Sequence, residues 1–190
     1  MVMDKCKALK KLEEEIENNK DLPLLEANLV FGEGNADCKI LFIGEAPGKK
    51  EDELRRPFVG RSGKLLEKTL CGIGISRDDV YITNIIKRRP PENRDPSKSE
   101  ITAYTPYLIR QIDIIKPTVI ATLGRFSMNY FLPDATISID QGHVFKVGEY
   151  FVYPIYHPAA AMRNKKTMAE FKNSFKKLQL AIKKCEGLNK

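Results

Sequence analysis

Four short apolar runs, separated by stretches with helical periodicity, constrain the fold of this chain more than any other feature. The runs are rich in β-branched residues and lie at 39–43, 80–86, 118–124 and 151–156. Runs of this length, bounded by turn residues, are typical of strands buried on both faces of a sheet. Because helical stretches lie between them, the sequence predicts right-handed βαβ units and a three-layer α/β/α fold around a four-stranded parallel sheet.

Apolar residues that recur every three to four positions indicate the helices. Ser97 and Glu100 form a capping box at the start of one of them, and Asp4 is a plausible cap of the first. Pro106 is expected to kink or break the helix in which it lies. We expect helices over 4–18, 62–71, 97–115, 125–131 and roughly 167–184, a short edge strand at 29–31, and a hairpin-like excursion within 134–150.

The composition is that of an ordinary globular protein, with 42% apolar and 30% charged residues among 190. One domain over 1–190 is the economical interpretation, and we expect a monomer. No apolar run is long enough to span a bilayer, and the first residues lack the apolar core of a signal peptide, so we expect a cytoplasmic, intracellular protein. The net charge of +7 favours a polyanionic partner, although many basic proteins only carry solvated lysines.

The four cysteines, Cys6, Cys38, Cys71 and Cys185, form no C-x-x-C pair and have no close histidine partner. This spacing fits neither a zinc site nor a redox pair. We expect buried, inert thiols, and no bound metal.

Polar or aromatic side chains follow three of the predicted strands, where a core would not need them. Glu45, Asn84 and His157 lie at strand ends, and Phe58 lies in the loop after the first strand. The three polar residues each have an ordinary explanation, as a solvated carboxylate, a satisfied core amide or a turn residue. Because ligands bind beyond the carboxyl ends of parallel strands, the four together predict a site at that edge of the sheet.

The chemistry of this set suits a flipped pyrimidine base. The ring of Phe58 can stack on the base, and the Asn84 amide offers an acceptor and donors to the edge of uracil. An imidazole N–H from His157 can stabilise negative charge on the departing base. The carboxylate of Glu45 can orient water at the sugar, and the reaction needs no metal.

Three motifs in this order and spacing resemble those of the family 4 uracil-DNA glycosylases. The resemblance covers about Gly32 to Arg163. The motifs are Gly44-Glu-Ala-Pro-Gly48 with Glu51-Asp52 and Pro57-Phe-Val-Gly60; Thr83-Asn-Ile-Ile-Lys87 with Arg89-Pro-Pro-Glu-Asn-Arg94; and His157-Pro-Ala-Ala-Ala-Met-Arg163.

The resemblance implies an enzyme of base excision repair that hydrolyses the N-glycosidic bond of uracil in DNA. We expect it to be monofunctional, because no lysine is indicated in the pocket as a Schiff-base nucleophile, and to act on single- or double-stranded DNA. By motif match Glu45 activates water and His157 supports the leaving uracil. Phe58, Asn84 and the backbone N–H of Ala46 would bind the base. The third motif would wedge into DNA. The residues implied for DNA contact are Arg61, Lys87, Arg89, Pro158, Ala159, Met162 and Arg163.

One departure from the family pattern is large. Family members usually hold a [4Fe–4S] cluster on four cysteines, whose positions match Asn19, Leu22, Arg88 and Tyr104 here. A cluster needs thiolate ligands, so we expect no cluster and no other cofactor. The loop 88–104 would then be held by packing and by the Ser97/Glu100 cap. Smaller departures are Arg55, where the family typically has glycine and which could add a phosphate contact, and Ser62.

Two other functions fit parts of the sequence. A DNA-binding sensor of the same fold would have lost turnover, but Glu45, Asn84 and His157 argue against that loss. A small-molecule nucleoside hydrolase would need neither the basic loops nor a wedge at 158–163. The sequence does not distinguish a preference for single or double strands, nor the acceptance of hypoxanthine, xanthine or modified uracils.

Overall fold

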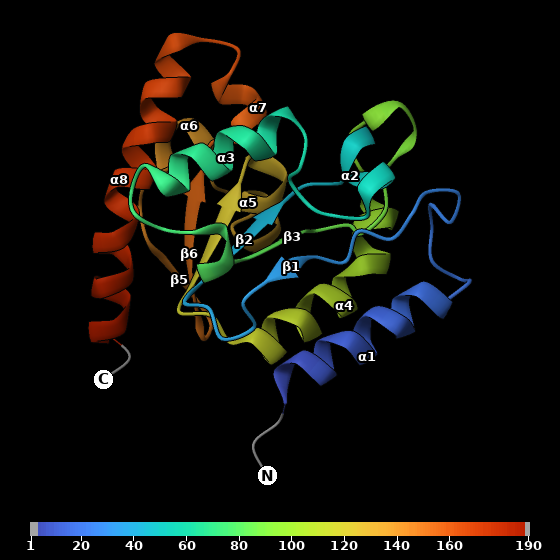
Figure 1. Ribbon diagram of the computed structural model, residues 1–190. Coiled ribbons are helices and arrows are strands. Elements are labelled where there is room, and N and C mark those ends of the chain that lie inside the picture. The colour runs from blue at the N-terminus through green and yellow to red at the C-terminus, as the bar shows by residue number, and fades with distance from the viewer. Residues whose placement is uncertain (1–3, 189–190) are drawn as a thin grey trace.

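The computed structural model of this protein describes residues 4–188, and its centre is a six-stranded mixed sheet in the order β1-β3-β2-β4-β6-β5 (Figure 1). The four inner strands are parallel, and the two edge strands are antiparallel to their neighbours. The predicted four-stranded parallel sheet is therefore wrong as a description of the whole sheet. The strands are β1 (Glu33–Gly34), β2 (Ile40–Gly44), β3 (Tyr81–Asn84), β4 (Val119–Leu123), β5 (Phe145–Val147) and β6 (Tyr150–Ile155).

The apolar runs of the sequence do not predict the two edge strands, because these strands are short and partly exposed. The first edge strand, β1, is two residues long and follows the segment 29–31 that was predicted as a strand. That segment is buried but irregular, and the Val30 N–H donates to the Lys87 carbonyl at 2.8 Å. The predicted excursion in 134–150 is confirmed in its second half, where β5 and β6 form a hairpin that turns at Gly148.

Helices cover both faces of the sheet, which confirms an α/β fold of three layers (Figure 1). On one face α1 and α4 pack against the sheet, and on the other α3 and α8 do so. Short helices fill the connections. The helices are α1 (Lys5–Asn18), α2 (Lys49–Leu54), α3 (Arg61–Cys71), α4 (Lys98–Ile115), α5 (Arg125–Phe131), α6 (Ile137–Asp140), α7 (Pro158–Ala161) and α8 (Lys165–Leu188), with 3₁₀ turns η1 (Arg77–Asp79) and η2 (Pro91–Asn93).

Alternation along β2 connects the two halves of the core. Phe42 points to the α3/α8 side, where its ring stacks on Phe175 with centroids 5.9 Å apart. Leu41 and Ile43 point to the opposite side, toward α1 and α4. Successive side chains of a strand alternate between faces, so one buried strand fills both layers.

The predicted helix caps are confirmed. Asp4 accepts from the Lys7 N–H at 3.2 Å, and Ser97 and Glu100 form the reciprocal capping box of α4. Arg94 adds two hydrogen bonds to Glu100, at 2.9 and 2.6 Å, which lower the pKa of Glu100 to about 2. The helix α4 continues through Pro106 and is not broken there.

The prediction that all four thiols are buried is wrong for two of them. Cys38 and Cys185 are buried, whereas Cys6 and Cys71 are exposed on the outer faces of their helices. Burial raises the pKa of Cys38 to about 11. No helix among residues 4–188 is long and apolar enough to cross a membrane.

Candidate active site

Strands β2 and β3 end side by side, and their last residues bring two of the predicted site residues together. Gly44 pairs with Asn84 in the parallel ladder, and Glu45 follows Gly44 directly. Gly44 allows this approach because it has no side chain. A Cβ there would lie 2.6 Å from Phe58 Cζ and closer still to Asn84 Oδ1. The amide of Asn84 and the ring of Phe58 therefore both lie against the backbone of Gly44.

The Asn84 amide is the clearest sign of a binding site. Asn84 is 1% exposed, and its Oδ1 accepts no hydrogen bond from any residue of the described range. A buried acceptor without a partner costs free energy on the order of 1–3 kcal/mol, so such atoms mark places where something else supplies the donor. The location beside an aromatic ring suggests a planar ligand with an N–H at its edge.

His157 is held in one tautomer by its own turn. It caps α7, and its Nδ1 accepts from the Ala159 N–H at 3.1 Å. The proton of the neutral ring is therefore on Nε2. Burial lowers the pKa of His157 to about 4. The negative charge of Glu51 opposes this shift, and the positive charge of Arg163 adds to it. At neutral pH His157 is an uncharged donor.

The ring of Phe58 connects the two halves of the site. Its centroid is 5.8 Å from that of the His157 ring, with the planes tilted by 40°. Phe58 is buried, and its backbone has the left-handed φ of 51°. On the other side, Gly124 has φ 94°, and a Cβ there would lie 2.9 Å from His157 Cβ. Two glycines thus make space for the aromatic and imidazole rings.

Glu45 has the electrostatics of a general base. It is half-buried, and burial together with the negative charge of Asp95 raises its pKa to about 7, while Arg125 opposes the shift. Asp95 and Arg125 also bind each other at 3.2 Å. The sequence did not identify either of them as part of the site. They are 30 residues apart in irregular or exposed positions, and no local pattern connects them.

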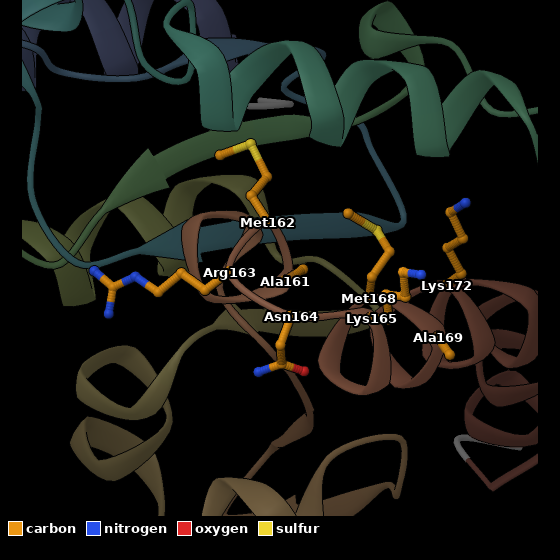
Figure 2. A pocket seen from close by; sticks show the side chains of 8 residues that line it. All are labelled: Ala161, Met162, Arg163, Asn164, Lys165, Met168, Ala169 and Lys172. Atoms are coloured by element: carbon orange, nitrogen blue, oxygen red, sulfur yellow. The ribbon is translucent and has the colours of Figure 1, made fainter.

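The predicted wedge forms one short helix and the turn that follows it. Ala159 is half-buried, and Met162 and Arg163 are exposed, whereas Pro158 is buried and begins α7. Beside them lies an open cavity of about 520 Å³ between α7 and the start of α8. Figure 2 shows Met162 and Arg163 pointing in different directions from its rim. Its lining residues are Ala161, Met162, Arg163, Asn164, Lys165, Met168, Ala169 and Lys172.

The prediction that Lys87 contacts DNA is wrong, because its side chain is completely buried. Its Nζ donates to Thr83 Oγ1 at 2.6 Å, to the Asn84 carbonyl at 2.9 Å and to Gln111 Oε1 at 2.6 Å. All three donors are used, so none is left for a phosphate. The other basic residues lie where DNA can reach them. Arg61 and Arg163 are exposed, and the half-exposed Arg89 donates to Asn93 at 2.8 Å.

The four positions that match the family's cluster ligands do not fit an iron–sulfur cluster. Tyr104 is fully buried and donates to the Pro23 carbonyl at 2.8 Å, and Leu22 is buried too. Arg88 is 5% exposed and binds the Ala27 carbonyl at 2.5 Å and Glu17 at 3.0 Å. Asn19 donates to Tyr107 at 2.7 Å. None of the four is a thiolate, and their side chains occupy the space with protein contacts.

Arg55 lies near Arg88, and its side chain binds other residues of the protein. It ends α2 in a left-handed conformation with φ 53°, which suits the glycine typical of the family. Its guanidinium binds Glu17 at 3.3 Å and Asn28 at 2.9 Å. In the described residues 4–188, no group of three or more His, Cys, Asp or Glu side chains is placed to hold a metal ion.

Comparison with known proteins gives consistent matches. The family model of the uracil DNA glycosylase superfamily matches residues 31–179. A type-4 uracil-DNA glycosylase of Sulfurisphaera tokodaii is 45% identical, covering 92% of this chain and 86% of that protein. Type-4 enzymes of Archaeoglobus fulgidus and Thermotoga maritima are each 44% identical. The match covers 83% of this chain and 84% of the former, and 76% of this chain and 77% of the latter.

Proposed function

The chain belongs to the uracil DNA glycosylase superfamily and is a uracil-DNA glycosylase, and we propose that its catalytic site lies at the carboxyl ends of β2, β3 and β6. The observation that carries this proposal is the buried, unpartnered Oδ1 of Asn84 beside the ring of Phe58. A base flipped out of DNA presents a flat face and a hydrogen-bonding edge, and this pair matches both.

Recognition of uracil follows from the donor and acceptor pattern of Asn84. Its Oδ1 accepts from uracil N3–H, and its Nδ2 donates to the neighbouring O4. Phe58 stacks on the base, and the backbone N–H of Ala46 supplies a further donor. Cytosine presents an acceptor at N3, so it would leave the Asn84 acceptor unpaired.

Glu45 activates the water that attacks C1′ of the deoxyribose. As the C1′–N1 bond breaks, its electron pair passes to uracil and the sugar gains oxocarbenium character. The carboxylate stabilises that positive charge and takes a proton from the water. Uracil leaves as its N1 anion and then takes up one proton from solvent, which balances the water proton that Glu45 removes and later releases. The products are free uracil and an abasic sugar with a hydroxyl on C1′. Because the pKa of Glu45 is raised to about 7, the base is present in its active form from neutral pH upward.

His157 supports the leaving group without transferring its proton. Its Nε2–H donates to uracil O2, where negative charge develops. Its pKa of about 4 keeps it neutral throughout the working range. The reaction stops at the abasic site, because the nearby Lys87 amine is enclosed by three acceptors and is not available to form a Schiff base.

We also propose that the enzyme works without an iron–sulfur cluster. Arg88, Tyr104 and Leu22 support this, since they fill the corresponding positions with buried side chains. Iron analysis and visible absorbance of protein purified without oxygen test it. Protein with four iron atoms per chain would contradict the proposal.

DNA binding is proposed for the exposed basic residues and for the turn after α7. Met162 would fill the space that the flipped base leaves, and Arg163, Arg61 and Arg89 would contact phosphates. A monomer is sufficient for this arrangement.

The test uses a labelled oligonucleotide with one uracil, and a matched one with thymine. Purified protein should produce an alkali-dependent break only at uracil. Asn84→Ala and Glu45→Gln should each lower the single-turnover rate by at least about 100-fold, and Glu45→Gln should keep its DNA affinity. Wild-type rates in both variants would refute the assignment of the site.

A further inference from the structure

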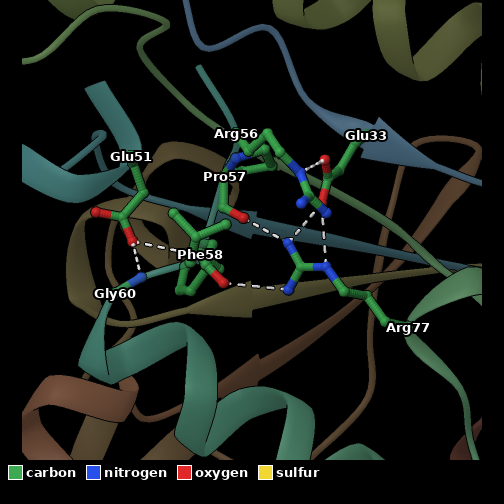
Figure 3. A network of polar contacts seen from close by, with 8 residues as sticks. Glu33, Glu51, Arg56, Pro57, Phe58, Gly60 and Arg77 are labelled. Carbon is green, nitrogen blue, oxygen red and sulfur yellow. Dashed lines mark hydrogen bonds and ion pairs between the residues drawn. The ribbon is translucent and has the colours of Figure 1, made fainter. Parts of the chain in front are cut away.

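We propose that Arg77, anchored by Glu33, and Glu51 are positioning residues that hold Phe58 in the place where it stacks on uracil. This inference rests on the proposed function and extends it to residues that touch neither base nor DNA. Figure 3 shows Arg77 and Glu51 reaching the Phe58 loop from opposite sides.

Phe58 needs support because its backbone is in the left-handed region, with φ 51°. That region is unfavourable for a bulky residue and persists only when the surroundings enforce it. The ring is also in a confined place, against Gly44 and 5.8 Å from His157. A relaxed backbone at Phe58 would turn the ring away from both.

Arg77 binds the backbone carbonyls of Phe58 and of the residue before it. Its guanidinium donates to the carbonyl of Phe58 at 3.1 Å and to the carbonyl of Pro57 (Figure 3). The Arg77 side chain is 14% exposed, so these bonds are largely shielded from water. A guanidinium holds five donors in one rigid plane, so Arg77 can bind two carbonyls and the Glu33 carboxylate at once, whereas an ammonium group has only three donors on a flexible stem.

Glu33 of β1 fixes the guanidinium of Arg77 in turn. Its Oε1 accepts from Arg77 Nε at 3.0 Å and from Nη2 at 2.8 Å. The same carboxylate accepts two hydrogen bonds from Arg56, at 2.7 and 3.0 Å. Burial opposes ionisation of Glu33, but the bonds from the two arginines prevail and lower its pKa. The Arg56 side chain thus shares Glu33 with Arg77, but within residues 4–188 it donates no hydrogen bond to the backbone of residues 57–60.

Glu51 binds the chain on the C-terminal side. Its Oε1 accepts from the Val59 N–H at 3.0 Å and from the Gly60 N–H at 2.8 Å. Gly63 allows the first turn of α3 to lie directly against this loop, since a Cβ there would overlap the Phe58 carbonyl. Two carbonyls and two amides around Phe58 are therefore bound by side chains from η1 and α2, and these bonds hold the backbone that carries the ring.

Arg77→Met and Arg56→Met form a matched pair for the test, because both remove an arginine from Glu33 and only the first frees the Phe58 loop. Two ligands are measured: free uracil as an inhibitor, and an oligonucleotide carrying a tetrahydrofuran abasic analogue, which has no base. We expect Arg77→Met to weaken uracil inhibition about tenfold, since stacking is lost. Affinity for the abasic DNA should change less than about twofold in both variants.

A second variant separates positioning from stability. Arg77→Lys keeps the positive charge beside Glu33 but cannot reproduce both hydrogen bonds to the Pro57 and Phe58 carbonyls. It should therefore retain thermal stability and still lose uracil affinity. In a Phe58→Ala background, Arg77→Met should have no further effect on uracil inhibition, because the ring that it positions is absent. Independent, multiplying effects of the two substitutions would overturn the proposal, as would equal uracil inhibition of Arg77→Met and Arg56→Met.

Failure of the inference and failure of the proposed function give different results. If the wild-type protein cleaves at uracil and Arg77→Met resembles Arg56→Met, only the positioning role is refuted. If the wild-type protein neither cleaves at uracil nor is inhibited by free uracil, the proposed function itself is wrong.

Discussion

Gly44→Ala tests the centre of the proposed site with one methyl group. The new Cβ would lie 2.6 Å from Phe58 Cζ and 2.7 Å from Cε2, whereas ordinary contact begins at 3.4 Å, so the ring must retreat by about 0.8 Å. Asn84 must move as well, and both side chains are buried. Gly44 does not have a positive φ, so the backbone itself accepts alanine.

The expected cost falls mainly on catalysis. Overpacking of this size destabilises a fold by about 1–3 kcal/mol, which a protein of this length should survive. A displacement near 1 Å in groups that orient a substrate lowers rates on the order of 100-fold. We therefore expect the single-turnover rate on a uracil oligonucleotide to fall by about that factor, with a folded protein by circular dichroism.

Gly187→Ala is the matched control, since nothing lies within 4 Å of a Cβ at that helical position. It should cleave at the wild-type rate and be slightly more stable. If Gly44→Ala also cleaves at the wild-type rate, then Phe58 and Asn84 do not contact the base as proposed.

Four further predictions concern pH, stability and DNA binding. The single-turnover rate should rise about tenfold per pH unit below 7 and level off above it, because Glu45 must lose its proton, and a flat profile would exclude it as the base. Because the pKa of Glu45 is raised in the folded state, its contribution to stability is full below pH 4.5 and is lost as the pH rises through about 7. In urea titrations, the unfolding free energy of the wild type should therefore fall by about 3 kcal/mol across that window relative to Glu45→Gln. Arg88→Ala should cost about 2 kcal/mol of stability, because it removes a buried partner of Glu17. Arg55→Ala removes an exposed partner of the same Glu17 and should cost less than about 0.5 kcal/mol. Equal melting temperatures of the two variants would contradict the packing role of Arg88. Arg163→Ala should reduce the slope of log affinity against log salt by about one on duplex DNA, and an unchanged slope would remove Arg163 from the interface.

Local patterns were sufficient for the inner strands, the long helices and the caps. Ser97 and Glu100 interact over three residues, and the apolar runs of β2 and β4 are short segments that each fill a whole strand. Strand ends were also predictable, and with them the grouping of Glu45, Asn84 and His157 at one edge. The carboxyl ends of parallel strands meet at the same edge, so the sequence was sufficient to place these three side chains together.

What the tertiary structure decided depends on contacts between residues far apart in the chain. Lys87 is basic and was expected to contact DNA, yet Gln111, which is 24 residues away, accepts a hydrogen bond from its buried amino group. Arg77 reaches Phe58 across 19 residues and Glu33 across 44. The two edge strands are too short for a periodic signal. Periodicity reports interactions within a few residues, whereas burial, charge pairing and backbone strain are set by whatever the fold brings into contact.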